Sequence, residues 1–112
     1  MEVQAKSTSE QKISEMVRRI VEGFHPDKII LFGSYARGAA GPDSDADLLV
    51  VMPVKGSKRE KAIEIDVELA GIGLSKDVIV VTAEEVEKYR DVVGTLICPA
   101  LREGKVLYER PA

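Results

Sequence analysis

Two short apolar runs separated by a polar stretch constrain the fold of this chain more than any other feature. The first run ends at Gly33-Ser34, and after ten further residues Asp45 and Asp47 precede the second run, residues 48–51. Apolar runs of this length, bounded by turn residues, predict buried β-strands. Because side chains alternate along a strand, the two aspartates are expected on the same face of a sheet.

The polar groups around this stretch predict binding of a metal ion and of phosphate. Two carboxylates side by side repel each other, so we expect a cation between them, most simply Mg²⁺. Gly33 permits close approach of the backbone, and the Ser34 hydroxyl can bond a phosphate oxygen. Arg37 has two interpretations: it binds phosphate, or it holds the loop by pairing with Asp43 or Asp45. Metal and phosphate groups this close together predict chemistry on a nucleoside triphosphate.

A third carboxylate, Asp77, begins the apolar run of residues 78–81 much as Asp47 begins its own. If the two strands are neighbours, their leading carboxylates converge, and three carboxylates suit a centre with two Mg²⁺ ions. The alternative is that Asp77 simply faces solvent at the end of a strand. Asp66 competes for the same role, but it lies in the middle of an expected helix and is predicted to be a surface residue. Tyr35 either borders the nucleotide or packs in the core.

The size and charge of the chain limit its class. At 112 residues it is expected to form a single domain, residues 1–112. The net charge of −3 differs from the basic excess of nucleic-acid-binding proteins, so no direct nucleic-acid binding is expected. No apolar run reaches the roughly 20 residues that span a bilayer. The first residues lack the apolar centre of a signal peptide, so a cytoplasmic location without membrane contact is expected. The one cysteine, Cys98, is predicted to be a buried thiol, and His25 to serve a turn, since zinc would need more ligands.

The hydrophobic periodicity and the capping residues predict a series of alternating helices and strands. Ser7, Thr8 or Ser9 is expected to cap a first helix that ends near Gly23. The further expected elements are a strand over 28–32, a turn into a short helix at 33–37, a strand over 45–52, a helix over about 58–71 packed on the sheet through a broad apolar surface, a strand over 77–81, a helix over 83–90, a helix over 91–103 interrupted near Pro99, and an edge strand over 105–108. This order predicts an α/β (α+β) fold with a small mixed sheet flanked by helices.

The spacing of the polar residues resembles the signature of the nucleotidyltransferase superfamily typified by DNA polymerase β. That signature is Gly-Ser, ten residues, Asp-x-Asp and a separate third carboxylate, here Gly33-Ser34, Asp45-Ala46-Asp47 and Asp77. The Gly-Ser-Tyr-Ala-Arg-Gly segment and the terminal Glu-Gly-Lys-Val-Leu-Tyr-Glu segment are most similar to the minimal nucleotidyltransferases. The resemblance implies the polymerase β-like nucleotidyltransferase fold.

The resemblance also implies an activity, a cofactor and a partner. It implies transfer of AMP from ATP to a hydroxyl, with Asp45, Asp47 and Asp77 holding two Mg²⁺ ions and Gly33 and Ser34 holding the β- and γ-phosphates. Minimal nucleotidyltransferases often act as antitoxins beside a helical HEPN ribonuclease toxin and attach AMP to one of its tyrosines. The expected partner is therefore a HEPN-type toxin, in a hetero-oligomer, with a homodimer as the alternative for the chain alone.

Two other functions stay open at this stage. The chain could be an antitoxin that neutralises its partner by binding alone, with an idle site. It could also be a small-molecule nucleotidyltransferase of the antibiotic-modifying kind, although such enzymes normally need a further helical domain. Little of the chain is left to shape an acceptor pocket, so we expect another protein to bind the acceptor. Apolar residues near the C-terminus serve either that interface or the core: Val92, Val93, Leu96 and Ile97.

Overall fold

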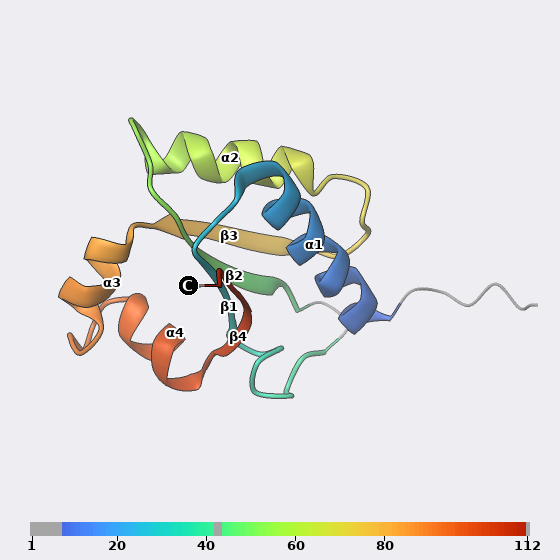
Figure 1. The fold of residues 1–112 in the computed structure, drawn as a ribbon. Coiled ribbons are helices and arrows are strands. Elements are labelled where there is room, and N and C mark those ends of the chain that lie inside the picture. The colour runs from blue at the N-terminus through green and yellow to red at the C-terminus, as the bar shows by residue number, and fades with distance from the viewer. Residues whose placement is uncertain (1–7, 42–43, 112) are drawn as a thin grey trace, which may run out of the picture.

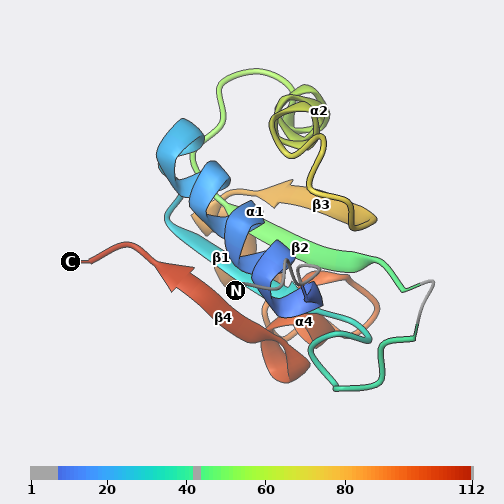
Figure 2. The same ribbon diagram turned by 90° about the vertical axis from the view of Figure 1, so that its right-hand side faces the viewer.

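Helices cover both faces of a small sheet in the computed structural model, which describes residues 8–41 and 44–111. The elements follow in the order α1 (Ser9–Phe24), β1 (Lys28–Phe32), β2 (Ala46–Val51), α2 (Lys58–Glu68), β3 (Lys76–Val81), α3 (Ala83–Tyr89), α4 (Ile97–Glu103) and β4 (Lys105–Glu109). Helices α1 and α2 lie on one face of the sheet and α3 and α4 on the other (Figures 1 and 2). The predicted mixed α/β architecture is confirmed. Among the described residues, none of the helices is long and apolar enough to cross a membrane.

The sheet is mixed, with strand order β3-β2-β1-β4. Strand β1 pairs antiparallel with both β2 and β4, whereas β2 pairs parallel with β3. A parallel pair needs a crossover connection, and α2 supplies it. The apolar runs of β1 and β2 occupy the centre of the sheet because they are buried on both faces, and β4 lies at an edge as predicted.

Alternating side chains of the strands feed two hydrophobic cores, one on each face of the sheet. The core under α1 and α2 contains Met16 and Ile65 together with Leu48 and other strand residues. The core under α3 and α4 contains Leu49 and Val51 of β2, packed with Ile97. By the same alternation, Asp47 belongs to the face that carries α3 and α4.

Side-chain caps set several helix ends where the sequence predicts them. Thr8 caps α1, since its hydroxyl accepts from the Gln11 N–H at 3.1 Å while its own N–H donates to the Gln11 side chain at 2.8 Å. The alternative cap, Ser7, lies outside the described residues. Thr82 and Glu85 form the same reciprocal capping box at the start of α3. At the end of α1 the left-handed conformation falls on His25 (φ 51°), so His25 serves a turn as predicted, and Gly23 lies inside the helix.

Two predicted helices differ in the structure. Residues 33–39 form successive turns rather than a short helix, with the Arg37 N–H donating to the Gly33 carbonyl at 3.2 Å. The last helix begins at Ile97 rather than at residue 91. Gly94 has a φ of 99°, which breaks a helix, and Pro99 stands in the first turn of α4, where an N–H has no intrahelical partner to lose. Pro99 therefore starts a helix instead of interrupting one.

Several apolar residues that the sequence places in the core are exposed. Helix α2 ends at Glu68 and packs on the sheet through Ile65, with Leu69 buried at its C-terminal end and Ala62 partly buried. Its other two large apolar residues, Ile63 and Val67, are 54% and 69% exposed. The prediction that this helix packs on the sheet is confirmed, but its packed surface is narrower than predicted. In the α3–α4 connection, Val93 is 84% exposed, but Ile97 is buried in the core.

Candidate functional site

The Gly-Ser turn and the second aspartate of the Asp-x-Asp pair lie in direct contact. Antiparallel pairing of β1 and β2 places Phe32, the last residue of β1, opposite Asp47. Gly33 follows with a φ of 78°, a conformation that favours glycine, and a Cβ added there would lie 2.2 Å from Oδ2 of Asp47. Because Gly33 has no side chain, the Asp47 carboxylate can occupy the space that a Cβ would fill.

Asp77 lies beside Asp47 on the neighbouring strand. The parallel register of β2 and β3 pairs the two residues directly, so their side chains start from the same face of the sheet. The predicted neighbourhood of the two strands is thus confirmed. Burial raises the pKa of the Asp47 carboxyl above its usual range, and the charges of Asp77 and then Asp45 raise that pKa further. The charges of Asp45 and Asp77 therefore act on Asp47, while both of these residues are themselves exposed.

The donor set fits a hard divalent cation. Carboxylate oxygens are the ligands that Mg²⁺ prefers. Burial and then the charges of Asp77 and Asp45 disfavour the ionised form of Asp47, and a bound cation would favour it. In residues 8–41 and 44–111, however, no three acidic, histidine or cysteine side chains are drawn together around a common point. The structure therefore brings the carboxylates to one end of one face without closing them into a coordination shell.

The turn after β1 carries Ser34 and Arg37. Besides the bond to Arg37, the turn is closed by the Ala39 N–H, which donates to the Ser34 carbonyl at 2.9 Å. The Arg37 guanidinium lies 3.8 Å from a carboxylate oxygen of Glu103, at the end of α4, and its charge lowers the pKa of Asp47. Of its two partners predicted within the loop, Asp43 lies outside the described residues. Within the described part of the chain, Arg37 forms an ion pair with Glu103 and none with Asp45.

Glu103 is a neighbour of the site that sequence reasoning missed. Close packing of the next residue, Gly104, against β1 brings it there, since a Cβ at Gly104 would lie 2.6 Å from the side chain of Ile30 and 2.9 Å from the carbonyl of Leu31. No local pattern links Glu103 to Arg37, because the contact depends on how α4 packs across the sheet.

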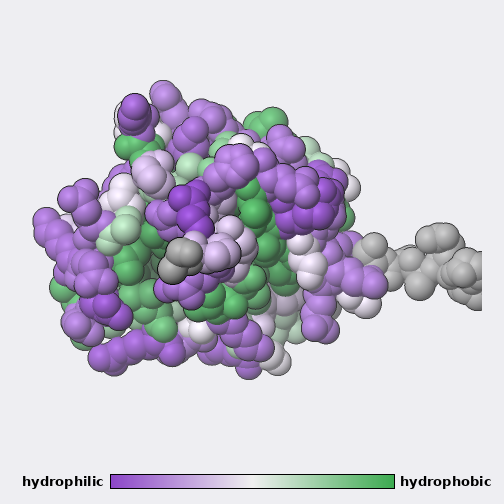
Figure 3. Space-filling view, viewed as in Figure 1, coloured by the Kyte–Doolittle hydropathy of each residue, from purple (hydrophilic) through white to green (hydrophobic). Residues whose placement is uncertain are grey.

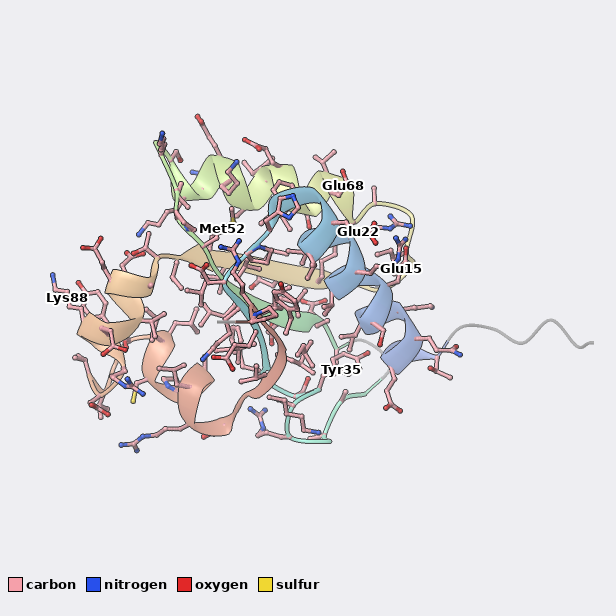
Figure 4. The ribbon with its side chains drawn as sticks, in the orientation of Figure 1. Glu15, Glu22, Tyr35, Met52, Glu68 and Lys88 are labelled. Carbon is pink, nitrogen blue, oxygen red and sulfur yellow. The ribbon has the colours of Figure 1, made fainter. Side chains whose placement is uncertain are left out.

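Tyr35 points away from the carboxylates. Its ring packs in the core under α1, and its hydroxyl lies 3.5 Å from Oγ of Ser9 at the start of that helix. Figure 4 labels Tyr35 between the loop after β1 and the first turns of α1. Of its two predicted roles, the structure supports packing.

The remaining candidates have structural roles. Cys98 is 3% exposed, which confirms a buried thiol. Asp66 is exposed on α2, as predicted, and forms an ion pair with Lys76 at 3.4 Å. Two lysines of α2 form ion pairs as well: Lys58 with Glu85 of α3, and Lys61 with Glu64, one turn further along α2.

The hollows of the described surface lie mostly away from the carboxylates. Two adjoining hollows of 420 and 430 Å³ run between α1 and β4, where Figure 3 shows apolar side chains between polar borders. One of 440 Å³ lies beside α3. A shallower one of 290 Å³, between α2 and β3, includes Asp77 in its lining. None of these hollows includes Asp45 or Asp47 in its lining.

Comparison with known proteins finds a family model and a relative that match this sequence. The model of the nucleotidyltransferase domain family matches residues 10–108. A Methanocaldococcus jannaschii protein to which the name protein adenylyltransferase has been assigned is 34% identical over 106 residues, which cover 88% of this chain and 70% of that protein.

Solved structures share the fold. A Sulfolobus solfataricus protein assigned as a nucleotidyltransferase is 20% identical, with a TM-score of 0.61 over 96% of this chain and 94% of that one. A toxin–antitoxin crystal structure with AMP-PNP gives a TM-score of 0.55 at 22% identity, covering 92% of this chain and 75% of that one. At these identities the likeness concerns the fold.

Proposed function

This chain belongs to the nucleotidyltransferase domain family, and we propose that it transfers AMP from ATP to a hydroxyl of a partner protein. The observation that carries the proposal is the contact of Gly33 with Asp47, with Asp77 paired to Asp47 on the next strand. This arrangement joins a turn suited to phosphate to a set of carboxylates suited to metal ions. It supports a reaction in which a nucleoside triphosphate is bound and split at that end of the sheet.

Asp45, Asp47 and Asp77 would hold two Mg²⁺ ions. When bound, such a pair of ions neutralises the attacking and leaving oxygens of an in-line displacement. The Gly33 backbone and the Ser34 hydroxyl would hold the β- and γ-phosphates.

Arg37 would supply a planar positive group on the phosphate side, held there by Glu103. The acceptor hydroxyl would give its proton to the Asp77 carboxylate or to water, and its oxygen would form a bond to the α-phosphorus, while the bond from that phosphorus to pyrophosphate breaks. Positioning and charge neutralisation account for most of the catalysis in transfers of this kind.

We propose that the acceptor belongs to a HEPN-type toxin and that the hydroxyl is that of a tyrosine, so that this chain acts as an antitoxin. Two observations support a protein acceptor: the name assigned to the Methanocaldococcus relative, and the exposure of Asp45 and Asp77 at the surface. A partner would then supply the missing walls of the site in a hetero-oligomer. Such an ATP-dependent antitoxin would act in the cytoplasm.

The test is incubation of the purified chain with the HEPN-type protein proposed as its partner, ATP and Mg²⁺, followed by intact-mass measurement. We expect the partner to gain whole increments of AMP. Asp77→Asn should abolish the gain while partner binding persists, because it removes one charge from the carboxylate set. Asp66→Asn, its matched control on the exposed side of α2, should transfer AMP at the unmodified rate.

The competing functions predict different results in the same experiment. Neutralisation of the toxin without any mass increase, by the unmodified chain and by Asp77→Asn alike, would indicate inhibition by binding. Labelling of a small molecule in place of the partner would indicate an enzyme of the antibiotic-modifying kind.

A further inference from the structure

Two hydrogen bonds join Ser44, the residue before Asp45, to Gly41. The Ser44 hydroxyl accepts from the Gly41 N–H at 2.8 Å, and the Ser44 N–H donates to the Gly41 carbonyl at 3.1 Å. One of these bonds depends on the side chain, and the other uses only the backbone. The hydroxyl is therefore the part of this closure that a substitution at Ser44 removes.

Asp45 lies between Ser44, which is bonded to Gly41, and Ala46, which is also held in place. On its other side, Ala46 is fully buried and donates its N–H to the Ser75 carbonyl at 2.9 Å. Asp45 itself is exposed and precedes the first residue of β2. The backbone of Asp45, from which its carboxylate extends, is thus held by the residues before and after it.

Packing does little to fix residues 37–41, the described residues that precede Ser44 in this loop. Residues 37–41 are all exposed, and residues 38–41 consist of glycine and alanine, which bury little apolar area. Such a segment loses much conformational freedom when it is ordered, so hydrogen bonds carry more of its structure than side-chain contacts do.

We propose that Ser44 is a positioning residue, whose hydroxyl holds Asp45 in place for metal binding. This inference rests on the proposed function, in which Asp45 is a metal ligand. Without the hydroxyl, the Gly41 N–H donates to water instead, and the backbone between Ser44 and Asp45 becomes more mobile. The free energy of metal binding is then less favourable, because binding must also order the backbone of Asp45. The fold is unaffected, because Ala46 keeps its own bond to Ser75.

The experiment measures Mn²⁺ affinity by electron paramagnetic resonance, together with the melting temperature, for the unmodified chain and four variants. Ser44→Ala should weaken Mn²⁺ binding roughly fivefold, the equivalent of one hydrogen bond of about 1 kcal/mol. Ser44→Thr, which keeps the hydroxyl, should restore the affinity. Asp45→Asn should weaken binding more than Ser44→Ala does.

Ser57→Ala is the matched control. It removes the same kind of bond, a hydroxyl that accepts from the Glu60 N–H at 3.1 Å, at the start of α2 and away from the carboxylates. It should lower the melting temperature and leave Mn²⁺ affinity unchanged.

Three outcomes would overturn the inference. If Ser44→Ala binds Mn²⁺ like the unmodified chain while Asp45→Asn does not, Ser44 has no positioning role and the proposed function stands. If Ser44→Thr is as weak as Ser44→Ala, the hydroxyl is not the cause. If Asp45→Asn itself binds normally, Asp45 is not a ligand, and the proposed metal site fails together with the inference.

Discussion

The contact between Gly33 and Asp47 makes the sharpest prediction about this protein. In Gly33→Ala, the new methyl would lie 2.2 Å from Oδ2 of Asp47, where ordinary contact begins at about 3.4 Å, so the carboxylate must retreat by about 1 Å. The φ of 78° adds a backbone cost of about 1–2 kcal/mol for any residue with a Cβ. A displacement of about 1 Å in a catalytic group can lower a rate about 10²-fold. We therefore expect Gly33→Ala to fold with reduced stability and to lose about two orders of magnitude in AMP transfer.

Gly56→Ala separates the two effects. Gly56, in the loop between β2 and α2, has a φ of 90° and no atom within 4 Å of an added Cβ. Gly56→Ala should lower the free energy of unfolding by the same backbone term of about 1–2 kcal/mol and keep full activity. Urea denaturation measures the free energy of unfolding, and the initial rate of AMP transfer to the partner measures the site. If the two variants lose activity equally, or if Gly33→Ala remains fully active, the role assigned to the contact is wrong.

Two further predictions concern Asp47 and the junction of α1 with α2. Because the pKa of Asp47 is raised in the folded chain, its ionisation costs stability as pH rises through that raised value, and below its ordinary pKa of 3.8 the cost is absent. Asp47→Asn should therefore melt at a higher temperature than the unmodified chain at neutral pH without divalent ions, with the difference shrinking toward pH 4; equal melting curves at every pH would contradict this. Arg19 donates to the carbonyls of Glu68 and Ala70 at 3.2 and 3.1 Å, so Arg19→Gln should lower the free energy of unfolding in urea by about 1–2 kcal/mol. Arg18→Gln, which removes only exposed ion pairs, should cost less than about 1 kcal/mol, and the reverse ranking would refute this account of the junction.

Local signals in the sequence predicted the elements wherever neighbouring residues decide the structure. Thr8 with Gln11 and Thr82 with Glu85 satisfy the first N–H groups of their own helices, so the pattern is sufficient. The same kind of reasoning failed at Pro99. A proline marks either an interrupted helix or a helix start, and the choice between them depended on the turn at Gly94 before it.

Burial was harder to predict than secondary structure. Ile63 and Val67 are as apolar as Ile65, yet only Ile65 faces the sheet. The orientation of α2 about its axis follows from the strands beneath it, which lie far away in the sequence. The same holds for Tyr35. Its ring packs in the core because α1, which lies far away in the sequence, is next to it in the fold.

The sequence by itself determined the chemistry of the site: a glycine and serine after one strand, two aspartates before the next, and a third carboxylate before another. Those properties are local, since they depend on residue type and on the alternation of side chains along a strand. Only the tertiary structure decided that β1 lies antiparallel to β2, which sets Gly33 against Asp47, and that β3 lies parallel to β2 in the register that pairs Asp77 with Asp47. It also brought Glu103 to Arg37. Strand order and register depend on burying both hydrophobic cores at once. Because residues from the whole chain contribute to these cores, no short segment specifies the order or the register.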